Sequence, residues 1–153
     1  MENIREIMEA AVSEYGASKA FTLKLGDGEY RDISYSRYYE EIRCLGEALL
    51  CRGFSNTRIV IIGKNSYNWY LANMATLLTS NITVPLDKEL KYDEFESSLI
   101  RSEAEVIFYD EKESESVAKA ISSGKTRIKA AFPLFKVSDK TDIYDLTVEG
   151  REL

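Results

Sequence analysis

The chain has 153 residues, enough for one domain with its own hydrophobic core. Hydrophobic residues make up 44% of it and charged residues 30%, a composition that excludes a disordered protein. The formal net charge of -6 argues against nucleic acids and anionic membranes as partners, because their phosphates repel an acidic surface, and no basic stripe offsets this repulsion.

The N-terminal segment, residues 1–11, is charged and has the periodicity of an amphipathic helix rather than the composition of a signal peptide. Its apolar face is expected to consist of Ile4, Ile7, Met8 and Ala11. We therefore expect a cytoplasmic protein. The N-glycosylation pattern Asn81-Ile82-Thr83 would then not be glycosylated.

Two short strands are predicted next, at residues 21–25 and 30–33, joined by the tight turn Gly26-Asp27-Gly28. The turn leads into a strand and not into a helix. It is therefore a hairpin turn and not a dinucleotide-binding fingerprint.

A helix is predicted after Ser34, which is a favourable N-cap, and Gly53 fits its C-terminal cap. One face of this helix is apolar and rich in tyrosine, which is more typical of a core than of a ligand site: Tyr35, Tyr38, Tyr39, Ile42, Leu45, Gly46 and Leu49.

Both cysteines, Cys44 and Cys51, fall in this helix, seven residues apart. A helical rise of about 1.5 Å per residue separates their Cα atoms by about 10 Å, whereas a disulfide needs less than about 7 Å. We expect two free, buried thiols. The chain has no histidine, which excludes the usual zinc sites.

Strands and helices then alternate, which predicts right-handed crossovers and a mostly parallel sheet. Buried-type strands are expected at residues 58–63, 82–86 and 106–109, and a last strand within 127–132; helices are expected at residues 67–79, 92–101 and 111–121. The first three strands should be neighbours. The predicted fold class is thus α/β, a mostly parallel sheet with helices on its faces, preceded by a helix and a β-hairpin.

No linker or repeat divides the chain, so residues 1–153 are predicted to form a single α/β domain. The tail, residues 136–153, has no assigned element beyond one or two helical turns at residues 143–149.

One uncharged stretch, residues 65–86, is long enough to cross a bilayer. Its asparagines, threonines and proline make it too polar for a membrane span. The helix within it is apolar on every face and should be enclosed. Together with the apolar segment 130–135, it suggests that the chain self-associates if nothing else covers these surfaces.

No nucleophile–base pair or acid–base pair is apparent. Gly124-Lys125-Thr126 resembles the end of a phosphate-binding loop, but Lys119 stands where that motif needs glycine, and a helix precedes it. Gly63-Lys64 fails in the same way, with Arg58 at the glycine position. We therefore assign no catalytic, cofactor-binding or metal-binding residue.

The turn Gly63-Lys64-Asn65-Ser66 is the most ligand-like feature, because it lies between the carboxyl end of a buried strand and the amino end of a helix. The alternative is a helix start with Ser66 as its N-cap. Asp87-Lys88-Glu89 follows the next strand and has the same two interpretations.

Five segments occur in an order and spacing that resemble a known family. They are residues 30–35 (YRDISY), 49–54 (LLCRGF), 58–69 (RIVIIGKNSYNW), 84–90 (VPLDKEL) and 102–109 (SEAEVIFY). The order resembles the N-terminal part of the adenylate-forming superfamily, the AMP-dependent synthetases and ligases. The Gly-x-Asn-x-x-x-Trp and Val-Pro-Leu-Asp segments are most similar to long-chain fatty acid-CoA ligases. The resemblance runs from about residue 3 to residue 110.

The resemblance implies a full-length parent enzyme that activates a fatty acid with ATP and Mg²⁺ to acyl-AMP and then forms acyl-CoA. The family's phosphate loop, adenine motif, ribose-binding Asp and late catalytic Lys have no matching positions here. The chain is therefore expected to be an inactive N-terminal fragment without a bound cofactor, whose partner is the remainder of its parent chain. Two alternatives remain: a free-standing flavodoxin-like interaction module, and a small nucleotide-binding protein that uses the Lys64 turn.

Overall fold

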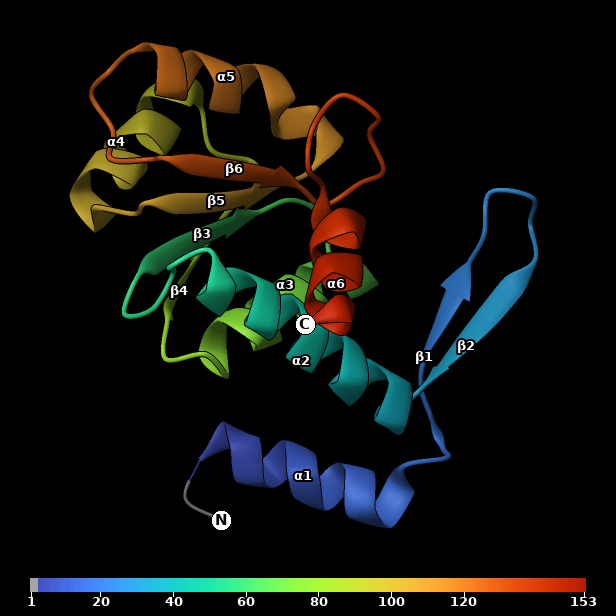
Figure 1. The fold of residues 1–153 in the computed structure, drawn as a ribbon. Coiled ribbons are helices and arrows are strands. Elements are labelled where there is room, and N and C mark those ends of the chain that lie inside the picture. Colours follow the sequence, from blue (N-terminus) through green and yellow to red (C-terminus); the bar gives the residue numbers. More distant parts are fainter. Residues whose placement is uncertain (1–2) are drawn as a thin grey trace.

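The computed structural model describes residues 3–153 and has three layers, a parallel sheet between two layers of helices (Figure 1). The sheet consists of β3 (Arg58–Ile62), β4 (Ile82–Leu86), β5 (Val106–Tyr109) and β6 (Ala130–Pro133). Their order is β4-β3-β5-β6, and each neighbouring pair is parallel. The predicted α/β class and the adjacent parallel strands are confirmed.

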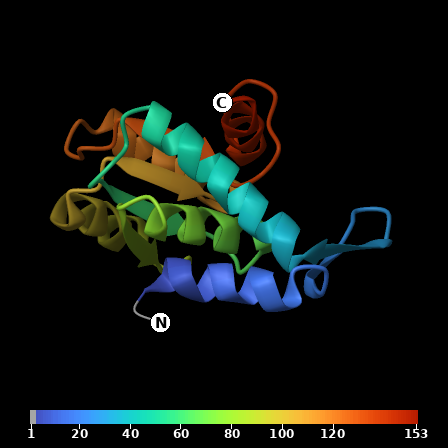
Figure 2. The ribbon, with the colours of Figure 1, turned by 60° about the horizontal axis from the view of Figure 1, so that its bottom comes forward.

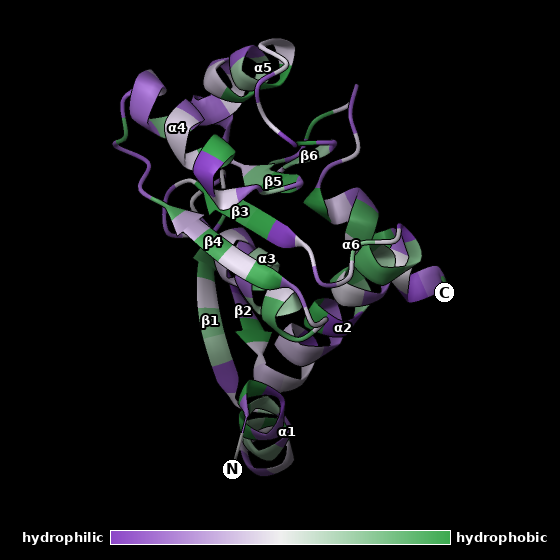
Figure 3. Ribbon diagram, turned by 90° about the vertical axis from the view of Figure 1, so that its left-hand side faces the viewer, coloured by the Kyte–Doolittle hydropathy of each residue, from purple (hydrophilic) through white to green (hydrophobic). Residues whose placement is uncertain are grey.

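The central strands are hydrophobic on both faces because helices cover both, and β3 and β5 are largely green in the hydropathy view (Figure 3). On one face, Val60, Ile62 and Ile107 pack against α4 (Tyr92–Ser102) and α5 (Ser114–Ser122), the latter preceded by the short 3-10 helix η1 (Glu111–Glu113). Phe95 and Leu99 provide the buried side of α4. Successive strand residues point to opposite faces, so the remaining strand positions form the second core.

On the opposite face, Ile59, Ile61 and Phe108 pack against α2 (Tyr35–Cys51), α3 (Tyr67–Leu77) and α6 (Ile143–Glu152). Figure 2 shows α2 between α6 and α3. The predicted caps are confirmed. The Oγ of Ser34 accepts a hydrogen bond from the Arg37 amide, and Gly53 adopts a left-handed φ of 87° just after the end of α2.

The N-terminal helix and the hairpin stand outside these layers (Figure 1). Helix α1 (Ile4–Tyr15) lies against α2, and Arg5 Nη2 donates to the carbonyl oxygen of Leu78 at 2.6 Å. Strands β1 (Lys19–Lys24) and β2 (Tyr30–Ser34) form the expected antiparallel hairpin. The predicted apolar face of α1 is wrong in part, because Met8 is buried while Ile4 and Ile7 are exposed.

The tail helix is longer than predicted. The helical turns expected at residues 143–149 are confirmed and continue to Glu152, forming helix α6, which packs along α2. Ile143 and Leu146 are completely buried there. A Cβ added to Gly150 would lie 1.6 Å from the Cys44 carbonyl oxygen, so only glycine permits this approach of the two helices. Helix α6 therefore belongs to the core.

The structure also corrects the expectation that residues 130–135 need a cover from outside the chain. Phe132, Pro133 and Leu134 are buried within the described chain. Helix α3 is only partly enclosed, since Leu71, Ala72 and Ala75 are buried while Tyr70 is exposed.

The cysteine prediction is confirmed for the two free thiols and for the burial of Cys44, and it is wrong for Cys51, which is exposed. Gly150 of α6 lies against the backbone of Cys44, whereas Cys51 lies in the last turn of α2.

The two edge strands share a residue type. The chain has two prolines, and Pro85 lies in β4 while Pro133 ends β6. Proline has no amide hydrogen to donate, so it is tolerated at the edge of a sheet and not in the middle.

Candidate functional site

A topological switch point lies at the carboxyl edge of the sheet. From β3 the chain passes through α3 to β4 on one side, and from β5 it passes through α5 to β6 on the other. The loops after β3 and β5 therefore leave two adjacent strands in opposite directions. Open α/β sheets bind ligands in the crevice that such a divergence creates.

Gly63 and Asp110 are in close contact at this point. The Asp110 amide donates to the Ile62 carbonyl oxygen at 3.1 Å, and Gly63 has a φ of 155°. A Cβ at Gly63 would lie 2.7 Å from the Asp110 Cβ, so the strand end has room for glycine only. The contact joins the two diverging loops.

The Lys64 turn lies beside this contact, as its position after β3 predicts. Ser66 is the N-cap of α3, and its Oγ accepts a hydrogen bond from the Trp69 amide at 3.2 Å. Lys64 and Asn65 are exposed and line an open hollow of about 730 Å³ between this turn and the hairpin. The capped-helix interpretation is confirmed, and Lys64 faces solvent.

The second candidate turn, Asp87-Lys88-Glu89, is exposed and closes on itself. The Oδ1 atom of Asp87 accepts a hydrogen bond from the Glu89 amide at 2.8 Å, and the Leu90 amide donates to the Asp87 carbonyl oxygen. Hydrogen bonds of this kind define an ordinary aspartate turn.

Glu113, in η1, was not singled out by the sequence. Its side chain is buried, and among the described residues its Oε2 has no hydrogen-bond partner. Burial, followed by the negative charge of Asp110, raises the pKa of the Glu113 carboxyl, while Lys112 and Lys88 act in the opposite direction. Asp110 thus contacts Gly63 at the start of the Lys64 turn, and Glu113 interacts in turn with the charge of Asp110. No group of three or more potential metal ligands is present among residues 3–153.

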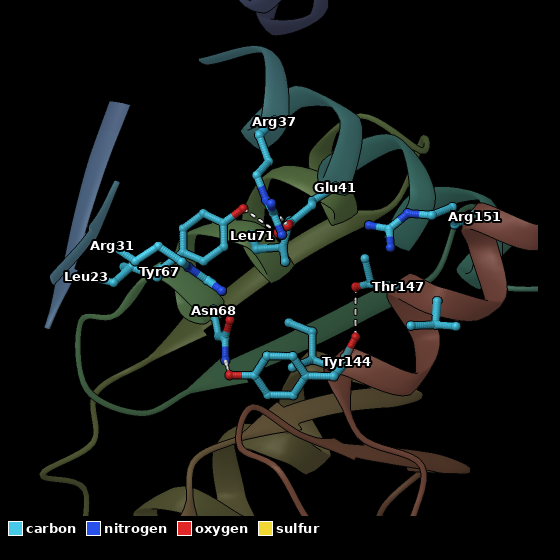
Figure 4. A pocket seen from close by; sticks show the side chains of 12 residues that line it. Leu23, Arg31, Arg37, Glu41, Tyr67, Asn68, Leu71, Tyr144, Thr147 and Arg151 are labelled. Atoms are coloured by element: carbon cyan, nitrogen blue, oxygen red, sulfur yellow. Dashed lines mark hydrogen bonds and ion pairs between the residues drawn. The ribbon is translucent and has the colours of Figure 1, made fainter. Parts of the chain in front are cut away.

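A more enclosed pocket of about 200 Å³ lies between the hairpin, α2, α3 and α6 (Figure 4). Three arginines approach it from different sides, Arg31 from β2, Arg37 from α2 and Arg151 from α6. The remaining lining is mixed: Leu23, Glu41, Tyr67, Asn68, Leu71, Ile143, Tyr144, Thr147 and Val148.

We call this the arginine pocket. Glu41 is nearly buried, with only 9% of it exposed, and it holds two of the side chains that line one wall. Its Oε1 accepts from the Arg37 Nε at 3.0 Å, and its Oε2 accepts from the Tyr67 hydroxyl at 2.6 Å. Burial, together with the hydrogen bond and charge of Glu41, raises the pKa of Tyr67, which keeps the phenol protonated and donating. Arg37 and Tyr67 are thereby held in fixed orientations.

Asn68 ties the opposite wall together. Its Nδ2 donates to the Leu134 carbonyl oxygen at 2.8 Å and to the Tyr144 hydroxyl at 2.9 Å. These bonds connect α3 with the segment after β6 and with α6. The pocket therefore depends on the tail helix, of which the sequence predicted only one or two turns.

The comparisons with known proteins identify the family. The model of the AMP-binding enzyme family matches residues 8–147, and the chain belongs to this family of adenylate-forming enzymes. No curated protein matches the chain.

Solved structures share the fold at low sequence identity. A long-chain-fatty-acid CoA ligase from Rhodopseudomonas palustris superposes with a TM-score of 0.80 at 20% identity, covering 92% of this chain and 35% of that one. A long-chain-fatty-acid-CoA ligase from Archaeoglobus fulgidus gives 0.80 at 16%, covering 95% and 29%. The N-terminal domain of FACL13 from Mycobacterium tuberculosis gives 0.78 at 13%, covering 99% and 36%.

The chain thus spans about a third of the length of these relatives. Within residues 3–153, none of the helices combines the length and the apolar character needed to cross a membrane.

Proposed function

We propose that the chain is the N-terminal part of an AMP-forming fatty acid-CoA ligase, which activates a fatty acid to acyl-AMP and then transfers it to CoA. The observation that carries this proposal is the family match over residues 8–147, combined with coverage of about a third of the related structures. The ligases of Rhodopseudomonas palustris and Archaeoglobus fulgidus support the fatty acid as substrate class.

The residues present do not by themselves form a site for Mg-ATP. The turn after β3 has one cation, Lys64, and the first turn of α3 already uses the Trp69 amide in its cap. The adjacent loop brings the carboxylate of Asp110 against Gly63, and this negative charge repels a triphosphate. We infer that nucleotide binding requires segments outside residues 1–153, and that the chain alone is inactive.

Two measurements test the proposal. The reading frame that contains residues 1–153 should encode a phosphate loop within a few dozen codons after Leu153. Its full product should release pyrophosphate from ATP only when a fatty acid is added. A stop codon directly after Leu153, or a full product that releases no pyrophosphate with any fatty acid, would contradict the proposal.

The isolated chain provides the matched control. It should release no pyrophosphate, and calorimetric titration should detect no Mg-ATP binding tighter than about 1 mM, or about -4 kcal/mol. Tighter binding that Lys64→Gln abolishes would favour the nucleotide-binding alternative.

One observation favours the interaction-module alternative, namely that Phe132 and Leu134 are buried within the described chain, in the same core as Ile143 and Leu146 of α6. We retain the remainder of the parent chain as the proposed partner, with self-association through the incompletely enclosed α3 as a second possibility. Light scattering behind a sizing column distinguishes them: a monomer at tens of micromolar contradicts self-association and agrees with a self-contained module.

A further inference from the structure

The arginine pocket has an excess of positive charge in a chain whose net charge is -6. Three guanidinium groups line it, and Glu41 is the only carboxylate among its lining residues. Both oxygens of Glu41 are engaged, by Arg37 and by the Tyr67 hydroxyl. Glu41 can therefore balance only one of the three arginines.

The other two arginines lack strong partners. Within the part of the chain that the structure describes, the Arg31 guanidinium makes no hydrogen bond or ion pair. Arg151 has a single contact, to Glu40 at 3.9 Å, and both of these side chains are about half exposed. A surface contact of this kind contributes little. Figure 4 shows Arg31 and Arg151 pointing toward the pocket from opposite sides.

Aliphatic side chains form part of the remaining, mixed lining of the pocket. Leu23 comes from β1, Leu71 from α3, and Ile143 and Val148 from α6, and the Tyr144 ring extends this surface. A cavity of about 150 Å³ accommodates benzene, so about 200 Å³ suffices for a ring or a short chain that bears one acidic group. Guanidinium groups pair with carboxylates in a planar, two-pronged geometry.

We propose that this pocket binds a small organic acid, with its carboxylate between Arg31 and Arg151 and its apolar body against Leu23, Leu71 and Val148. Arg37, fixed by Glu41, presents a third cation at the same wall. The pocket shares Leu23, Arg31, Tyr67, Asn68 and Tyr144 with the open hollow beside the Lys64 turn. A ligand can enter through that hollow. The proposal does not depend on the activity of the parent enzyme.

Benzoate is the probe, and titration of the 153-residue chain by NMR or calorimetry is the measurement. We expect saturable binding with a Kd of about 1 mM or tighter, and at least about tenfold weaker binding of benzyl alcohol, which has the same ring without the charge. Inorganic phosphate, an anion without an apolar body, should also bind at least about tenfold more weakly.

The variant Arg31→Gln should weaken benzoate binding by about tenfold or more. Arg31 is exposed and its guanidinium has no partner in the described chain, so the thermal midpoint should not change. The matched control is Arg101→Gln, which removes the same charge from the exposed end of α4 on the opposite face of the sheet, and it should leave binding unchanged.

Three results would overturn the proposal. The first is that no benzoate binds at about 10 mM, which is about ten times the expected Kd. The second is that both arginine variants weaken binding equally. The third is that benzoate and either comparison ligand bind with equal affinity.

Discussion

The contact between Gly150 and the backbone of α2 leads to a quantitative prediction for Gly150→Ala. An added methyl group would lie 1.6 Å from the Cys44 carbonyl oxygen and 2.5 Å from its carbonyl carbon. Ordinary van der Waals contact begins at 3.4 Å. Both atoms belong to the backbone of α2, which cannot relieve the clash by a rotamer change as a side chain could. Helices α2 and α6 would have to separate.

Two opposing effects set the size of the change. Alanine is a better helix former than glycine by about 1 kcal/mol, which favours the variant. Overpacking of a tight contact costs about 1 to 3 kcal/mol, and separation also exposes part of Ile143 and Leu146, each worth about 1.5 to 3 kcal/mol when fully buried. We expect a net loss of about 2 kcal/mol or more. For a domain of this size, the thermal midpoint should fall by about 4 to 8 °C.

Urea unfolding followed by the fluorescence of Trp69 measures this loss, with circular dichroism for the thermal midpoint. Gly46→Ala is the comparison, because its methyl group would meet a side-chain atom, the Thr79 Cγ2 at 2.7 Å, and not a backbone. Its effect should be smaller. A Gly150→Ala protein as stable as the parent would refute the packing of α6 on α2.

Three further predictions concern single side chains. Glu113→Gln should make stability less dependent on pH. Because burial raises the pKa of the Glu113 carboxyl above its ordinary value of 4.5, the stabilisation by the protonated group is present at low pH and is lost as the pH rises through the folded-state pKa. In urea unfolding, the free energy of unfolding of the variant should therefore rise relative to that of the parent between pH 4.5 and pH 8. Equal pH slopes for both proteins would contradict this assignment. A thiol reagent should modify Cys51 in the native protein and Cys44 only after denaturation, and two fast native reactions would mean that the α2–α6 contact is open. Asn81→Ala should cost about 2 kcal/mol in urea unfolding, because the buried Asn81 Oδ1 accepts from the Thr57 amide and its Nδ2 donates to the Phe54 carbonyl oxygen; a loss under about 0.5 kcal/mol would show that water replaces these bonds.

The regular parts of the fold were predictable because local patterns and tertiary packing agree there. The run Ile59 to Ile62 can be buried on both faces only in a central strand, and Ser34 and Ser66 cap the helices that follow them. The full length of helix α6 and its place in the core were not predicted, because its stability comes from packing against α2, about one hundred residues earlier. A local signal was present, since Asp142 and Asp145 form a reciprocal capping box that marks the helix start.

The Lys64 turn and the arginine pocket also differ in how far local sequence patterns predict them. The Lys64 turn was placed correctly at the carboxyl edge because its position follows from the strand before it. The arginine pocket assembles residues 23 to 151 from five elements, and no local pattern brings them together. Glu41 offered a hint, because it lies one turn after Arg37 in α2, a spacing at which two opposite charges pair.

The prolines of β4 and β6 have a consequence for how the protein behaves when concentrated. A sheet with free edges can recruit strands from neighbouring molecules and grow into fibrils. Here each outer strand contains a residue that cannot donate to a newcomer, Pro85 at one border and Pro133 at the other. A continuous ladder of hydrogen bonds to a strand of another molecule is therefore interrupted at both edges of the sheet. We expect concentrated solutions of the folded chain to resist amyloid-type assembly, so that any association occurs through side-chain contacts and stays reversible.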